Sequence, residues 1–277
     1  MVSPLKSRTV RKIFLLFLLS FLMSAAVKTV SASATSRNWA GYVINSSDLT
    51  AISASWTVPE IHCPSGSTQI VSAAVGVWIG IDGLGTATPE QVGTNGLCVN
   101  GSATYVAWEE DATIKSGAQQ SFSEISGGDH ITASIAYLGN GQFRLKIADA
   151  QSSDSRTYTV IIPSAARASA EWIVEDPWNL ETGNYFSLPA FQQVSFSDCS
   201  AAMNNVAGSI LQNNAVPLSM TDSNHNIIVT PQGLNQAGTS FQVTQVGSPV
   251  PEAPSILGLL LPAFAAGIFS LRKKKLA

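Results

Sequence analysis

The stretch of residues 35–250 consists of short apolar or alternating runs, separated by clusters of Gly, Asn, Ser and Asp. Such runs are typical of β-strands, because successive side chains point to opposite faces and these four residue types favour turns. Hairpin turns are indicated at Asn100-Gly101 and at Gly139-Asn140-Gly141. Helical periodicity is weak, and residues 200–212 form the one modest helix candidate. The expected strands are residues 51–58, 73–81, 102–108, 130–137, 142–148, 157–162, 168–174, 193–196, 227–230 and 240–244.

Short strands at regular spacing favour an antiparallel sandwich or barrel over alternating strand and helix units. A length of about 215 residues suffices for one large β domain, and the sequence shows no internal repeat. We therefore expect an all-β domain over residues 35–245, followed by a tether that contains Gly and three Pro.

The N-terminal segment has the order of a secretory signal peptide. Basic residues at positions 6–12 precede an apolar run at 13–27, and small residues occupy 31–34. The apolar run is short for a membrane span. We expect a signal peptide at residues 1–34, cut near Ala32 or Ala34, with an uncleaved anchor as the alternative.

The C-terminal segment, residues 246–277, has a second unusual order. Pro251-Glu252-Ala253-Pro254 leads into an apolar run at 256–271, which basic residues 272–275 follow. Taken alone, this order indicates a short transmembrane anchor. It also resembles a bacterial PEP-CTERM sorting signal. That resemblance implies export to the cell surface or beyond, recognition by an exosortase, and membrane contact only through this segment before its removal.

The charge of the core differs from that of the whole chain. Residues 35–250 carry six basic and 17 acidic residues, a net charge of −11, whereas the full chain has a net charge of −3. An acidic surface disfavours nucleic acids and anionic membranes as partners. It suits a protein that works at low pH, although ordinary solubility explains it equally well.

Three cysteines lie in the core, Cys63, Cys98 and Cys199. In an exported protein one disulfide is expected, and Cys63–Cys98 is the first choice among pairings that the sequence leaves open. The spacings match no zinc motif. The chain also lacks a Gly-x-Ser-x-Gly elbow, a His-Glu-x-x-His helix and a phosphate-binding loop. Carboxylates are therefore the remaining candidates for acid–base chemistry.

Two expected strands carry such groups. In residues 168–176, alternation places Glu171 and Glu175 on the face opposite Trp172. In residues 77–83, it places Trp78 and Asp82 together, with a glycine between them. A solvated strand face explains the first pattern and core packing the second. Both patterns also fit the floor of a substrate groove.

Five segments in order resemble the glutamic peptidases, or eqolisins, over about residues 37–245. The segments are Asn38-Trp39-Ala40-Gly41-Tyr42, Ser55-Trp56-Thr57-Val58-Pro59, Trp78-Ile79-Gly80-Ile81-Asp82-Gly83, Gln91-Val92-Gly93-Thr94 and Ala170-Glu171-Trp172-Ile173-Val174-Glu175-Asp176. The resemblance implies a concanavalin A-like or jelly-roll sandwich of two curved antiparallel sheets, with the active groove on a concave face.

The resemblance also implies a site. Its catalytic pair would be Gln91 and Glu171, and the substrate-binding residues would be Trp78, Asp82, Trp108 and Glu109. The chain departs from many relatives after Trp108, where they carry a longer aromatic run. The implied activity is hydrolysis of protein or peptide substrates at acid pH, without metal or cofactor. The alternatives are a non-catalytic sandwich that binds carbohydrate or peptide, and a structural component of an extracellular matrix.

Overall fold

The computed structural model describes residues 34–65, 69–114 and 118–247, and these contain strands, turns and loops but no helix. The expected signal peptide (except Ala34) and the expected sorting signal lie outside the described residues. Within the described ranges, no helix is long and apolar enough to cross a membrane. The strands are β1 (Ala34–Ser36), β2 (Trp39–Asn45), β3 (Leu49–Thr57), β4 (Val71–Ile81), β5 (Glu90–Val99), β6 (Ser102–Asp111), β7 (Gln119–Phe122), β8 (His130–Gly139), β9 (Gln142–Asp149), β10 (Ser155–Ile161), β11 (Ser169–Glu175), β12 (Trp178–Asn179), β13 (Asn184–Tyr185), β14 (Gln193–Met203), β15 (Val206–Ser209), β16 (Val216–Thr221), β17 (Ile227–Pro231) and β18 (Phe241–Gln245).

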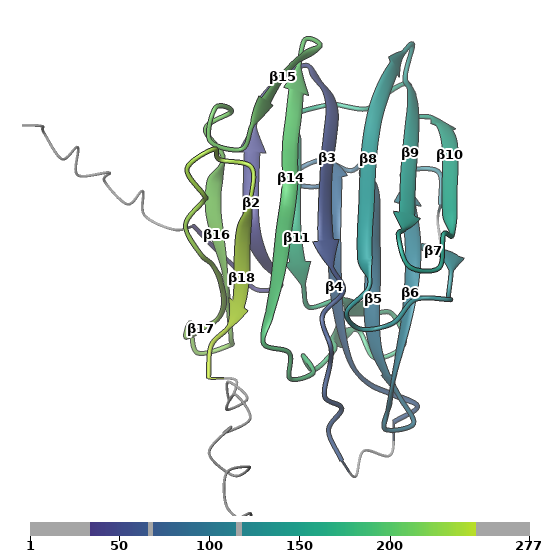
Figure 1. Cartoon of the computed structure of the whole chain (residues 1–277), viewed down its shortest axis with the longest axis vertical. Helices are drawn as coiled ribbons and strands as arrows, with labels where there is room; N and C mark the ends of the chain where they lie inside the picture. Colours follow the sequence, from purple (N-terminus) through teal and green to yellow (C-terminus); the bar gives the residue numbers. More distant parts are fainter. Residues whose placement is uncertain (1–33, 66–68, 115–117, 248–277) are drawn as a thin grey trace, which may run out of the picture. The chain divides into compact units, whose positions relative to one another are not determined.

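Most of these strands belong to one 16-stranded sheet that folds over into two layers. The strand order is β10-β9-β8-β3-β14-β18-β17-β16-β2-β11-β4-β5-β6-β7, with β1 and β15 off this path. In Figure 1, β9, β8, β3 and β14 lie in front of β11, β4, β5 and β6. The predicted all-β, two-layered sandwich is confirmed, and both predicted hairpin turns are present, with left-handed backbone at Asn100 and Asn140.

The helix expected at residues 200–212 is wrong. This segment contains the end of β14, a turn at Asn204-Asn205 and the strand β15. Both turn residues have positive φ, 51° and 63°. Ser200–Met203 pairs with β15 on one side and with β3 on the other. Long-range strand pairing has therefore overridden the local helical preference of an alanine-containing segment.

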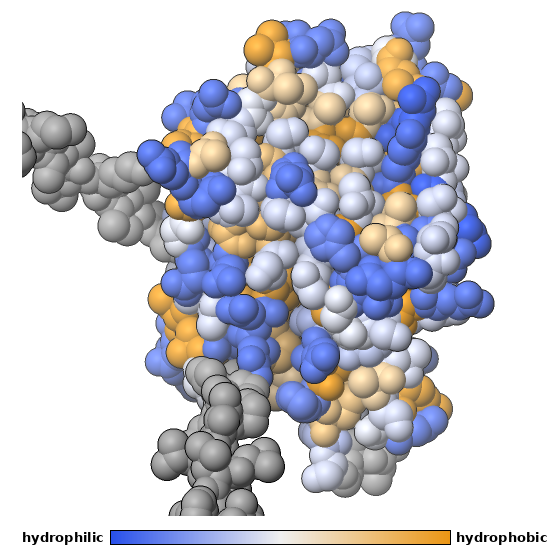
Figure 2. Space-filling view, viewed as in Figure 1, coloured by the Kyte–Doolittle hydropathy of each residue, from blue (hydrophilic) through white to orange (hydrophobic). Residues whose placement is uncertain are grey.

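The main core lies between the two layers and is filled by alternate residues of the facing strands. Buried tryptophans bridge the layers, since Trp56 of β3 donates to Thr94 Oγ1 of β5 at 3.0 Å. Trp172 of β11 likewise donates its indole N–H to the backbone oxygen of Ser53 at 3.0 Å. A buried indole N–H needs such a partner, so these bonds fix the two layers against each other. The outer face of β3, β8, β9 and β14 is mostly polar, with apolar residues in separate patches (Figure 2).

The predicted disulfide between Cys63 and Cys98 is confirmed, with the two Cα atoms 5.4 Å apart. It ties the loop after β3 to the end of β5. Cys199 is a buried free thiol.

Candidate active site

The outward face of β11 carries the carboxyls that alternation predicted. Trp172 belongs to the core between the layers, whereas Ile173 packs in a separate cluster on the other face. That second cluster also contains Trp78 and Trp108, and Trp39 packs against it. Three tryptophans therefore gather on the outward face of β2, β4 and β6.

Gln91 and Glu171 lie on either side of one glycine. Gly80 of β4 is directly opposite Gln91 of β5 and directly opposite Glu171 of β11. A Cβ placed on Gly80 would lie 2.9 Å from Gln91 Cγ and 3.3 Å from Glu171 Oε2. The two side chains therefore converge over a position that has no side chain of its own, and only glycine leaves the required space.

The same two side chains are almost fully enclosed. Glu171 is 0% exposed and Gln91 is 7% exposed. No described residue donates a hydrogen bond of good geometry to either oxygen of Glu171. A buried carboxyl without a hydrogen-bond partner lowers the stability of the folded protein, so a purely structural role does not explain Glu171.

The electrostatic setting of Glu171 favours its protonated form. Burial raises the pKa of Glu171 to about 8, and the charge of Asp82 acts in the same direction. The Ser169 hydroxyl and the N–H of Leu84 lie near enough to lower this pKa in part, although neither forms a hydrogen bond of good geometry with it. Perturbed carboxyls of this kind concentrate at functional sites.

Trp78 forms a rigid floor beside this pair. Its indole N–H donates to Glu175 Oε2 at 2.7 Å, and Asn38 Nδ2 donates to the other oxygen at 3.0 Å. Trp39 packs edge-to-face on Trp78 with ring centroids 5.1 Å apart. Burial raises the pKa of Glu175 to about 7, although the hydrogen bonds from Trp78 and Asn38 offset part of the effect. Glu175 was not among the predicted site residues, although alternation placed it on this face.

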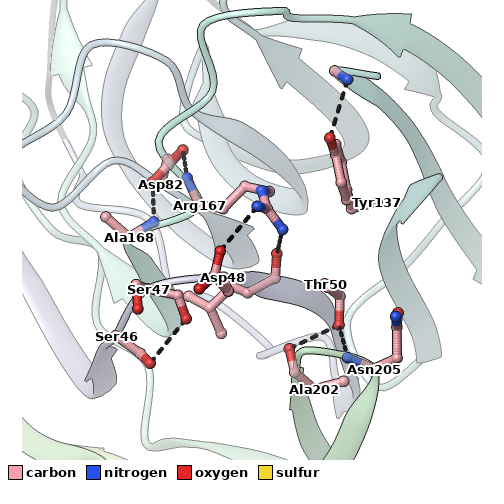
Figure 3. A network of polar contacts seen from close by, with 12 residues as sticks. Ser46, Ser47, Asp48, Thr50, Asp82, Tyr137, Arg167, Ala168, Ala202 and Asn205 are labelled. Atoms are coloured by element: carbon pink, nitrogen blue, oxygen red, sulfur yellow. Dashed lines mark hydrogen bonds and ion pairs between the residues drawn. The ribbon is translucent and has the colours of Figure 1, made fainter. Parts of the chain in front are cut away.

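Asp82 occupies a different position from Trp78. Its carboxylate accepts the backbone N–H groups of Arg167 and Ala168 at 2.7 and 2.8 Å, and it is 0% exposed (Figure 3). The N–H of Asp82 donates to the oxygen of Ser169 at 2.9 Å. Asp82 therefore holds the entry to β11, close to Glu171, and its oxygens already have partners within the protein.

The residues of β6 alternate between the two faces. Trp108 lies on the outward face with Trp78 and donates its indole N–H to Asn95 Oδ1 at 2.9 Å. Glu109 lies opposite Val92, a residue of the main core, so its side chain is on the inner face. Glu110 lies opposite Gln91 and shares its face. The structure thus brings Glu110, rather than the expected Glu109, beside the pair; counting in twos from Trp108 would have found it.

Comparisons with known proteins identify the family of this chain. The Peptidase A4 family model matches residues 37–245. The chain belongs to the Peptidase A4 family. The predicted resemblance to the glutamic peptidases is therefore confirmed. Among the described residues of this family member, no three or more His, Cys, Asp or Glu are grouped so as to hold a metal ion.

Aspergillopepsin-2 from Aspergillus niger is 27% identical over 189 residues, which cover 60% of this chain and 64% of that protein. The match therefore spans a little less than two thirds of that relative. Two solved structures share the fold. Scytalido-glutamic peptidase with a peptide-based transition state analog has a TM-score of 0.63 and 24% identity, covering 76% of this chain and 98% of its own. Aspergilloglutamic peptidase from Aspergillus niger has a TM-score of 0.54 and 22% identity, covering 63% and 99%.

Proposed function

We propose that this member of the Peptidase A4 family is an acid endopeptidase that hydrolyses proteins and peptides with Gln91 and Glu171. The convergence of these two side chains over Gly80 is the observation that carries the proposal. A carboxyl and an amide are sufficient for hydrolysis, since one moves protons and the other stabilises developing charge.

In the proposed reaction, ionised Glu171 removes a proton from a water molecule while the water oxygen attacks the peptide carbonyl carbon. The carbonyl electron pair moves to its oxygen, and the amide N–H of Gln91 donates to that oxyanion. Glu171 then delivers the proton to the leaving nitrogen as the C–N bond breaks and the oxyanion collapses to a carboxyl. Protein and water supply every group, and the net change is the addition of one water.

The raised pKa of Glu171 bears on this reaction. In the free protein the carboxyl holds its proton below about pH 8, because it is buried. Formation of the base therefore depends on donors that favour the ionised form, and the Gln91 amide, across Gly80, would be one. Hydrogen bonds from the attacking water and from the substrate backbone add to this effect.

Cleavage of a denatured protein by the purified full-length chain, followed from pH 2 to pH 8, tests the enzyme class. The expected result is acid cleavage that resists both pepstatin and a metal chelator, with new N-termini inside the substrate. Absence of cleavage by the folded protein at every pH would favour the alternative, a sandwich that binds carbohydrate or peptide without catalysis.

The domain arrangement is proposed on the sequence alone. Residues 1–34 would direct export, residues 35–245 would form the peptidase, and residues 246–277 would be a PEP-CTERM-like signal read by an exosortase. The protein would then act at the cell surface or outside the cell. Mass spectrometry of the protein from its native cells would show loss of both ends if this is correct, and retention of both if it is not.

A further inference from the structure

Exposed apolar side chains gather at a small hairpin that follows β11. The hairpin consists of β12 and β13, which form a separate two-stranded sheet. Trp178 is 49% exposed, Leu180 76% and Tyr185 37%, and Ile70, beside the same pocket, is 71% exposed. Single exposed apolar residues are common on proteins, but a contiguous group of this kind marks a binding surface.

A pocket of about 440 Å³ lies between this hairpin and the start of β4. Its apolar lining comes from Ile70, Val71, Trp178, Leu180 and Phe186. The one charged residue in the lining is Glu181. A pocket with this lining selects apolar side chains over charged ones, because burying a charge without a partner is unfavourable.

The hairpin is ordered by its own hydrogen bonds. Asn179 Oδ1 accepts the backbone N–H groups of Glu181 and Thr182 at 2.9 and 3.3 Å. Trp178 and Tyr185 pack edge-to-face with centroids 5.0 Å apart. The aromatic surface is therefore held in place before any ligand arrives, which lowers the entropy cost of binding.

The pocket and the catalytic pair share two strands. The hairpin continues directly from β11, which carries Glu171, and the pocket reaches Val71 at the start of β4, which carries Gly80. At about 3.3 Å per residue, the nine residues from Val71 to Gly80 span about 30 Å. An extended substrate would need about nine residues to cover this distance, so a short peptide bound at the pair cannot reach the pocket.

We propose that this pocket is an exosite that binds an apolar segment of a polypeptide substrate, about nine or more residues from the cleaved bond. The inference rests on the proposed peptidase function and adds a preference for long, unfolded chains over short peptides. Unfolded proteins present apolar segments that folded proteins bury, so this surface would capture them.

The test compares two substrates that contain the same cleaved bond, a reduced and alkylated protein and a six-residue peptide. In the full-length chain, Trp178→Ser/Leu180→Ser removes two of the exposed apolar side chains at the pocket. Val206→Ser/Ile227→Ser removes two exposed apolar side chains elsewhere, which are 72% and 47% exposed. We expect the first variant to raise KM for the protein about tenfold, leave kcat unchanged and leave the short peptide unaffected. The control should match the wild type with both substrates.

A second measurement separates this inference from the proposed function. Glu171→Gln is introduced into the wild type and into the Trp178→Ser/Leu180→Ser variant, so that neither protein cleaves the substrate. Fluorescence polarisation of the dye-labelled alkylated protein then reports its binding to each. Leu180→Ser alone removes a side chain that is 76% exposed, and it serves if the double variant does not fold. Equal affinity with and without the Trp178 and Leu180 side chains would overturn the exosite even if the wild type is an active peptidase. The exosite would also be overturned if Trp178→Ser/Leu180→Ser weakened the binding of carboxymethylcellulose but left the binding of the alkylated protein unchanged.

Discussion

At the scale of single residues, the site depends on what Gly80 lacks. Gln91 and Glu171 come from different strands and meet because the strand between them offers no side chain at the crossing point. The atoms that a Cβ would approach belong to the side chains of Gln91, Trp78 and Glu171, and none belongs to the backbone. Disturbing this position should therefore displace the pair while leaving the sheet intact.

Replacing Gly80 with Ala tests this dependence. The added Cβ would lie 2.9 Å from Gln91 Cγ, so we expect kcat/KM to fall at least about 100-fold. Circular dichroism should show an unchanged β fold. Gly233→Ala is the matched control, because a Cβ there meets no atom within 4 Å. Full activity of the Gly80 variant would show that the pair does not work from this geometry.

Residue-scale prediction from sequence succeeded where alternation within one strand was sufficient. It placed Glu171 and Glu175 on the face opposite Trp172, as the structure has them. The predicted role of Glu109 rested on resemblance without alternation, and the structure has this residue on the inner face. A shift of one residue along a strand exchanges the two faces, so Glu110 takes the place beside Gln91.

At the scale of elements, the turn after β4 positions β11. Asp82 has φ of 60° and accepts two backbone N–H groups from the segment that leads into β11. Arg167, which provides one of them, also forms an ion pair with Asp48 at 3.2 Å (Figure 3). The carboxylate of Asp82 is buried, whereas the ion pair is partly exposed to solvent, so the two contacts should differ in their effect on stability.

Replacing Asp82 with Ala leaves two backbone N–H groups without their acceptor. We expect the free energy of unfolding to fall by about 1–3 kcal/mol, because each buried unsatisfied donor is costly. Removing its negative charge should also lower the pKa of Glu171, which Asp82 raises. The acid limb of the pH–rate profile would then move to lower pH. Denaturant unfolding and the pH dependence of kcat/KM check both effects.

Asp48→Ala is the matched control for this prediction, with an expected change of about 0–1 kcal/mol because surface ion pairs contribute little. If Asp82→Ala and Asp48→Ala had equal stability and equal pH profiles, Asp82 would have no positioning role. Partial rescue by Asp82→Asn, which keeps one acceptor oxygen, would support the role.

Element-scale prediction was limited by pairing between distant strands. Local patterns located most strands, but they did not show that β14 continues through residues 200–203 beside β3. Nor did they place β2 between β11 and β16. Such neighbours are determined by the whole sheet, and a short run carries no information about them.

At the scale of the whole molecule, many carboxyls are buried. Glu90 is 0% exposed, faces the core, and has both oxygens without a hydrogen bond from any described residue. Burial raises the pKa of Glu90 to about 9, with added repulsion from Asp82, Asp111 and Glu171. Burial likewise raises the pKa of Glu109 to about 7. These raised pKa values, together with a net charge of −11 in the core sequence, predict that the folded protein is more stable at acid pH than at neutral pH.

The sign of the pH effect follows from these pKa values. The folded protein keeps protons that the unfolded chain releases near pH 4.5, so stability is fully present below that value and is lost towards about pH 9. Calorimetry from pH 3 to pH 9 should therefore show Tm falling as pH rises above about 5. The Tm of the Glu90→Gln variant should fall less steeply with rising pH. The Tm of the Glu124→Gln variant, which changes an exposed residue, should follow that of the wild type. A Tm that rises from pH 5 to pH 8 would contradict this account.

Fold class was the most predictable feature at this scale, since strand alternation and turn residues run through the whole core sequence. Strand spacing left a sandwich and a barrel open, and only the resemblance favoured the sandwich. The buried state of Glu90 was not predicted, because a carboxyl that follows Pro89 at the start of a strand gives no local sign of burial.

In the proposed reaction, Gln91 and Glu171 perform the chemistry together. The most direct test of this joint action is kcat/KM for one peptide with Gln91→Ala, Glu171→Gln and the double variant, beside Glu124→Gln as control. Each single change should lower kcat/KM at least about 100-fold, and the double variant should be little worse than the poorer single one, because the pair acts as a unit. Cleavage by folded Glu171→Gln at a rate near that of the wild type would contradict the claim and move the chemistry to another residue.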